Sequence, residues 1–175
     1  MSDYEIRVAN KGDEPFLWQM LYFASHMYEQ EGALPESLRT DPDLFYYVEG
    51  WTERPGDLGV IAISSDGLPA GAAWIRVMPP KNLLSCYCEP GIPELVIATT
   101  PQHRGQGIGT LMLRDVLEAA YPQHSAIVLS VRANNPALRL YQSFGFATVA
   151  RLTNRVGTES VVMRIELGAG RNLPP

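Results

Sequence analysis

The chain has 175 residues, of which 46% are hydrophobic and 19% are charged. This composition is typical of a globular protein, and the length fits one domain with a substantial core. The formal net charge of −5 argues against broad nucleic-acid binding and favours cationic small molecules as partners. No apolar run approaches the ~18 residues of a membrane span, and the first residues lack a basic, apolar signal segment. We therefore expect a cytoplasmic protein without membrane contacts.

Hydrophobic patterns separated by glycine and proline predict the order of helices and strands. In the first half we expect a strand at 5–9, a helix at 13–29, helical segments at 35–38 and 45–48, and a hairpin of strands at 58–64 and 70–78. Residues 79–91 are expected to be irregular. The second half is expected to contain a strand at 94–99, a helix at 107–120, a strand at 126–131, a helix at 136–144, and strands at 146–152 and 160–166. This order predicts one α/β domain over residues 1–167 and a flexible C-terminal tail at 168–175.

The sequence offers few residues for a metal site. Its only two cysteines, Cys86 and Cys88, are separated by a single residue. No further cysteines complete a set of ligands, so we expect a reduced structural pair and no bound metal.

Three glycines at alternate positions, Gly105, Gly107 and Gly109, follow an apolar strand and lead into a helix. Such a loop can turn its backbone N–H groups inward, and the start of the helix adds unpaired N–H donors, so the segment predicts a site for phosphate or pyrophosphate. A magnesium-nucleotide loop is excluded because no lysine follows the glycines, and the dinucleotide fingerprint lacks its third glycine. What remains is the pattern Arg-x-x-Gly-x-Gly, formed by Arg104, Gly107 and Gly109.

A second motif, NNPALRLYQSFGF, runs from Asn134 to Phe146. Its Asn-Asn-Pro turn predicts the start of a helix, with Asn134 as the cap, and Gly145 predicts its end. Ala137 and Tyr141 are four residues apart and share a helix face. The tyrosine is therefore either a core aromatic residue or a phenol presented to a site.

In this order and separation, the two motifs resemble the signatures of the GNAT superfamily, the acyl-CoA-dependent N-acetyltransferases. The resemblance covers roughly residues 93–151 closely and the first ninety residues only in general layout. It implies the GNAT fold, in which about four helices flank a mixed central sheet of about six to seven strands. It also implies acetyl-CoA as the co-substrate, with direct transfer of the acetyl group to a primary amine in a ternary complex.

The resemblance assigns the CoA site to the end of the strand, the glycine loop and the second motif. In the strand, it implies a bulged segment whose backbone pairs with the pantetheine arm and directs one N–H at the thioester oxygen. The implied residues are Ile97, Ala98, Thr99, Arg104, Gly105, Gln106, Gly107, Ile108, Gly109, Thr110, Asn134, Ala137 and Tyr141.

Two residues are candidates for proton transfer. By resemblance, Tyr141 is the general acid that protonates the departing CoA thiolate. Glu94 begins the cofactor strand, where several family members place a general base or a water-holding carboxylate. A surface acid at the start of a strand is an equal alternative for Glu94. If the strand is regular, Glu94 shares a face with Val96 and Ala98.

The acceptor has to be recognised by the first half of the chain, where aromatic residues and carboxylates are numerous. This mixture favours a small organic amine, although the aromatic residues serve equally well as core. Transfer to a protein N-terminus or lysine, and a catalytically silent CoA-binding sensor, are the alternatives. Self-association as a homodimer is compatible with the resemblance.

Overall fold

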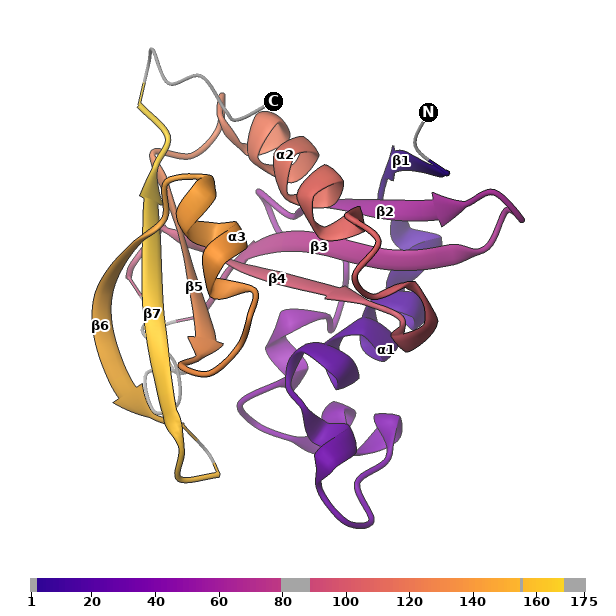
Figure 1. Ribbon diagram of the computed structural model, residues 1–175, viewed down its shortest axis with the longest axis horizontal. Helices are drawn as coiled ribbons and strands as arrows, with labels where there is room; N and C mark the ends of the chain where they lie inside the picture. The colour runs from indigo at the N-terminus through magenta and orange to yellow at the C-terminus, as the bar shows by residue number, and fades with distance from the viewer. Residues whose placement is uncertain (1–2, 80–88, 155, 169–175) are drawn as a thin grey trace.

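A single mixed sheet of seven strands runs through the computed structural model, which describes residues 3–79, 89–154 and 156–168 (Figure 1). The strands are β1 (Tyr4–Val8), β2 (Leu58–Ser64), β3 (Pro69–Val77), β4 (Pro93–Thr99), β5 (Ala126–Arg132), β6 (Ala147–Thr153) and β7 (Glu159–Glu166). Their order is β1-β2-β3-β4-β5-β7-β6, and every neighbouring pair is antiparallel except β4 and β5. This arrangement confirms the expected mixed sheet. Cys86, Cys88 and residues 169–175 of the expected tail lie outside the described residues.

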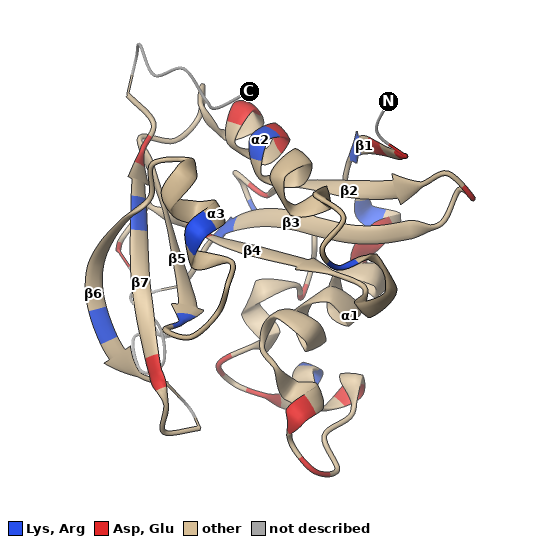
Figure 2. Ribbon diagram, viewed as in Figure 1, with Lys and Arg blue, Asp and Glu red and all other residues tan. Residues whose placement is uncertain are grey.

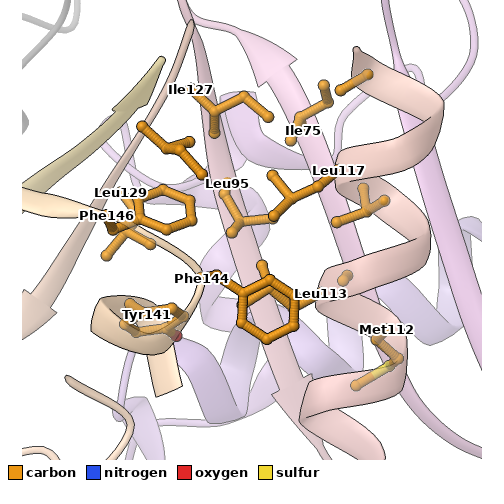
Figure 3. Packing of buried hydrophobic residues seen from close by; sticks show 14 of the residues in the cluster. Ile75, Leu95, Met112, Leu113, Leu117, Ile127, Leu129, Tyr141, Phe144 and Phe146 are labelled. Carbon is orange, nitrogen blue, oxygen red and sulfur yellow. The ribbon is translucent and has the colours of Figure 1, made fainter. Parts of the chain in front are cut away.

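Helices cover both faces of the sheet and enclose two hydrophobic cores. The α-helices are α1 (Glu14–Ala24), α2 (Ile108–Ala120) and α3 (Leu138–Ser143). The 3₁₀ segments are η1 (Lys11–Asp13), η2 (Met27–Glu29), η3 (Pro35–Thr40), η4 (Phe45–Tyr47) and η6 (Pro101–His103). Alternate residues of β4 serve the two cores: Leu95 packs with α2 and α3, whereas Val96 packs with α1. Figure 3 shows the first core, where Leu113 and Leu117 of α2 approach Leu95.

The first half of the chain is less helical than its pattern predicts. The helix expected at 13–29 ends at Ala24, and His26 takes a left-handed conformation with φ of 57° before η2 begins. The two short helical segments expected at 35–38 and 45–48 form the 3₁₀ turns η3 and η4. Short segments interrupted by proline cannot complete several α-helical turns, which is why they take the tighter form. No helix among the described residues is long and apolar enough to cross a membrane.

Candidate active site

The two parallel strands at the middle of the sheet separate soon after they meet. Only one pair joins β4 to β5, Glu94 with Val128, and the strands diverge from that point (Figure 1). On its other edge β4 pairs with β3 without a register shift, from Val77 opposite Pro93 to Gly71 opposite Thr99. The bulge that the family resemblance implied is therefore not seen in this ladder. The edge of β4 that faces β5 is left without a described strand partner beyond Glu94, so its backbone groups can pair with an extended ligand.

A cavity of about 830 Å³ occupies the space between the separated strands. Its walls come from β4, β5, the loop before α2, the start of α3 and the segment from α1 to η4. The predicted CoA residues that line it are Ile97, Ala98, Thr99, Arg104, Gly105, Gly107, Ile108, Gly109, Thr110, Asn134, Ala137 and Tyr141. Gln106 is the exception, because its side chain bonds to the Tyr4 hydroxyl and to the Gln102 carbonyl oxygen.

The glycine loop has the conformation that its sequence predicts. Gly105 and Gly107 have φ of 74° and 79°, values in the left-handed region that residues with a Cβ rarely adopt. Gly107 is the N-cap of α2, and no side chain caps this helix, so its first N–H groups remain free to bind an anion. On the far side of the loop, the Tyr4 hydroxyl holds the His103 Nδ1 at 2.8 Å, which ties the loop to β1.

The Arg104 side chain turns towards the acceptor half of the cavity. Its guanidinium carbon lies 5.8 Å from the centre of the Phe23 ring and 5.6 Å from that of Tyr28. These cation–π contacts join the glycine loop to α1 and η2. In this conformation the Arg104 charge faces aromatic rings rather than the anion loop, and its amide donates to the Pro101 carbonyl oxygen at 3.4 Å.

At the start of α3, the two asparagines have roles other than those predicted. Asn135, not Asn134, turns the chain into the helix, because its Oδ1 accepts a hydrogen bond from the Ala137 amide at 2.9 Å. The helix begins at Leu138, later than expected, and its N-cap is Ala137 without a side-chain capping bond, so Asn134 does not cap α3. Asn134 lines the cavity instead.

Tyr141 is both a core residue and a wall of the cavity. Its ring meets Phe146 edge to face with centroids 6.0 Å apart, and only 6% of the residue is exposed (Figure 3). Burial raises the pKa of the Tyr141 hydroxyl above its ordinary value, so the phenol keeps its proton at neutral pH. Tyr141 is therefore a core aromatic residue that can also present its phenol to the cavity.

Glu94 is buried, which excludes the alternative of a surface acid. It is 6% exposed and lines the cavity, and its Oε2 is buried without a hydrogen-bond partner. It shares the α1 face of the sheet with Val96 and Ala98, as the alternation of the strand predicts. Burial raises the pKa of Glu94 to about 7, and an interaction with the Tyr47 hydroxyl partly opposes that shift. A carboxyl with this pKa can exchange a proton near neutral pH.

Side chains of β3, including Arg76, the cross-strand neighbour of Glu94, hold η4 in place. The indole N–H of Trp74 donates to the Tyr47 carbonyl oxygen at 2.9 Å. Arg76 is fully buried, pairs with Asp57 at 2.6 Å, and donates to the Tyr46 carbonyl oxygen at 3.0 Å. These bonds fix the backbone of η4, and with it the Tyr47 side chain, against the sheet.

The comparisons with known proteins agree with this geometry. The model of the Acetyltransferase (GNAT) family matches residues 19–146. The chain belongs to this family. It is therefore an acyltransferase of the N-acetyltransferase type, a class that uses acetyl-CoA. A search of curated proteins gave no match.

Solved structures show the same fold at low sequence identity. A putative acetyltransferase, yncA, from Salmonella typhimurium with acetyl-CoA superposes with a TM-score of 0.68 at 18% identity, covering 99% of this chain and 98% of that one. A GCN5-related N-acetyltransferase from Kribbella flavida has a TM-score of 0.65 at 21% identity, with 94% and 98% covered. The spermidine/spermine N-acetyltransferase SpeG from Vibrio cholerae has a TM-score of 0.63 at 18% identity, with 94% and 93% covered.

Within this GNAT domain, several residues around the cavity were not predicted from the sequence. The sequence could have indicated a structural role for Arg76, because an arginine inside the apolar strand AGAAWIRV has to be paired when it is buried. Asp43 and Arg132 carry no comparable signal, because only the fold brings them to the cavity, whereas Tyr47 is one of the first-half aromatic residues expected near the acceptor. Among the described residues, no group of three or more histidine, cysteine, aspartate or glutamate side chains is arranged to hold a metal ion.

Proposed function

We propose that the protein transfers the acetyl group of acetyl-CoA to a primary amine of a small molecule, by direct attack within a ternary complex. One observation carries the proposal: a single cavity joins the anion loop and the free edge of β4 to a buried carboxyl with an unpaired oxygen. The residues of the cavity fit CoA because they offer free helix N–H groups for a diphosphate and an unpaired strand edge for an extended arm.

In the proposed complex, the N–H groups between Arg104 and Thr110 bind the diphosphate. The backbone of Ile97, Ala98 and Thr99 holds the pantetheine arm like an added strand. When bound, acetyl-CoA supplies an activated acetyl group as a thioester. One N–H of the β4 edge faces the thioester oxygen, where a donor aimed at developing negative charge can lower a barrier by ~3 kcal/mol.

The two buried acid–base groups then have complementary roles. Alkylammonium groups have a pKa of ~10.4 and cannot attack until they lose a proton. Glu94 accepts this proton, and the neutral nitrogen forms a bond to the acetyl carbon while the carbon–sulfur bond breaks. Tyr141 donates its phenolic proton to the departing sulfur, and the second proton that the nitrogen loses as it becomes an amide nitrogen restores the Tyr141 phenol. The buried phenol suits this role because it is still protonated at the pH where the thiolate leaves.

Two further observations support a small acceptor. The acceptor half of the cavity is walled by α1, η2 and η4 and is continuous with the half that is proposed to hold CoA. The SpeG structures, which share the fold, are described as spermidine N-acetyltransferases. Their identity to this chain is too low to transfer a substrate, but they show that the fold accommodates a small amine.

Release of free CoA thiol, measured with acetyl-CoA and a panel of primary amines, tests this function. Acetylatable peptides with a free N-terminus or a lysine serve as the competing class. We expect rapid release with at least one small amine and slow release with every peptide. Rapid release only with peptides, or CoA binding without release for any acceptor, would contradict the proposal.

A further inference from the structure

The acceptor half of the cavity is acidic beyond the needs of the proposed reaction. Three carboxylates line it: Glu29, Asp43 and Glu94. They belong to a strongly acidic part of the fold, since residues 27–50 contain six acids and one arginine. Figure 2 shows mostly acidic positions along this segment, below α1. A cavity of this charge attracts cations.

The charge of Glu29 is already balanced within the protein. Its Oε2 pairs with the Arg132 guanidinium at 2.6 Å, and its Oε1 lies 3.0 Å from the His26 Nδ1. The hydrogen bond from Arg132 lowers the pKa of Glu29, so this ion pair persists at neutral pH. The remaining arginine of the cavity, Arg104, stacks on aromatic rings at the glycine loop. Neither arginine is positioned to balance the other two acids.

Asp43 is an acidic residue of the cavity with no counter-ion among the residues that the structure describes. The neighbouring Asp41 holds its backbone, because Asp41 Oδ1 accepts hydrogen bonds from the amides of Asp43 at 2.9 Å and Leu44 at 3.2 Å. Within the part of the chain that the structure describes, the Asp43 carboxylate forms no ion pair and no side-chain hydrogen bond. Its charge contributes to the raised pKa of Tyr47, which places it on the side of the cavity where Glu94 lies.

Glu94 provides the second, independent observation. It is more than nine-tenths buried, its Oε2 has no hydrogen-bond partner, and it lines the same cavity. A buried polar atom without a partner is costly unless a ligand satisfies it. The acceptor end thus presents the Asp43 carboxylate, from the segment before η4, and the unpartnered Oε2 of Glu94, from β4.

We propose that Asp43 binds a second cationic group of the acceptor, so that the preferred substrates are compounds with at least two amino groups. The inference rests on the proposed function and adds the class of acceptor to it. One nitrogen of the substrate gives its proton to Glu94 and is acetylated. The other stays protonated at neutral pH, because its ordinary pKa is ~10.4, and pairs with the Asp43 carboxylate.

Acetylation kinetics with linear diamines and with monoamines of matching chain length test this assignment. The wild-type protein is expected to show a KM about tenfold lower for the best diamine than for its matched monoamine, with similar kcat. Asp43→Asn, which keeps the shape of the side chain, should remove this preference by raising only the KM for diamines. Glu36→Gln is the matched control, because Glu36 is an exposed acid outside the cavity and the change in net charge is the same.

The outcomes separate this inference from the proposed function. An undiminished preference for diamines in Asp43→Asn, or an equal rise in KM for both classes of amine, overturns the role of Asp43 while acetylation of amines still stands. Absence of acetylation for every amine overturns the proposed function and the inference with it. The wild-type protein gives a second measurement: added salt should raise the KM for diamines more than that for monoamines, and equal responses would contradict the ion pair.

Discussion

Replacing Glu94 with glutamine should affect activity and stability in opposite directions. The substitution keeps the size of the side chain and removes its ability to ionise. Glu94 is buried against α1 and has a pKa of about 7, compared with an ordinary value of 4.5. The same burial that makes this carboxyl a base at neutral pH makes its ionised form costly to the fold.

The magnitude of the stability effect follows from the two pKa values of Glu94. The folded chain retains this proton up to a pH of about 7, whereas the unfolded chain releases it near 4.5. The folded state therefore binds more protons in this window, and the free energy of unfolding falls as the pH rises through it. The difference of about 2.5 pH units corresponds to about 3 kcal/mol, an upper value for an interior that relaxes. The glutamine of Glu94→Gln cannot ionise, so the variant does not lose this free energy of unfolding as the pH rises.

Urea unfolding of the wild type and of Glu94→Gln at pH about 4.5 and pH about 8 measures the effect. Any constant cost of burying the amide cancels in the comparison between the two pH values. Relative to the wild type, the variant should gain up to about 3 kcal/mol between them. In parallel, kcat/KM for thiol release at pH about 7 should fall about 100-fold, the loss typical of a missing general base.

The pH profile decides whether Glu94 acts as the base. In the wild type, kcat/KM should rise through a pH of about 7, where Glu94 loses its proton, and then stay level until the pH approaches the amine pKa of ~10.4. This rise should be missing from Glu94→Gln. An inflection near pH 7 that persists in the variant, or a stability difference that does not change with pH, would refute the reasoning.

Three further predictions concern the loop, the acid and the acceptor wall. Gly107 and Gly67 have matching φ of 79° and 80°, and an added Cβ would meet open space at both. Gly107→Ala and the control Gly67→Ala should therefore each lower the free energy of unfolding by about 1 kcal/mol. Only Gly107→Ala should weaken CoA binding in calorimetry. Tyr141→Phe should lower kcat about tenfold or more with unchanged CoA affinity, and an unaltered rate would remove its role as acid. Arg76→Met should cost about 3 to 5 kcal/mol in urea unfolding, because Asp57 is left buried without its partner; a much smaller loss would show that water reaches that carboxylate.

Local patterns in the sequence predicted a large part of this protein. The alternation of apolar residues placed the strands to within about two residues, the usual uncertainty of element ends. The glycines of the loop indicated the left-handed turns before α2, because few other residues adopt them without strain. Two motifs were enough for the family, since each depends on a short run of chain.

The features of the fold that differ from the sequence-based expectations have one physical cause. The start of α3, the end of α1 and the regular β3–β4 register depend on packing against distant segments rather than on local preference. Gln106 lies in the predicted motif, yet Tyr4 of β1 draws its side chain away from the cavity.

Dependence on distant residues also explains which features of the site the sequence could not predict. The chain by itself specified an anion-binding loop, a helix that presents a phenol and the family to which both belong. Only the folded structure could show that Glu94 is buried, that Tyr47 interacts with it, and that β4 and β5 separate. Proton affinity depends on solvation and on neighbouring charges, and both are set by residues far away in the sequence.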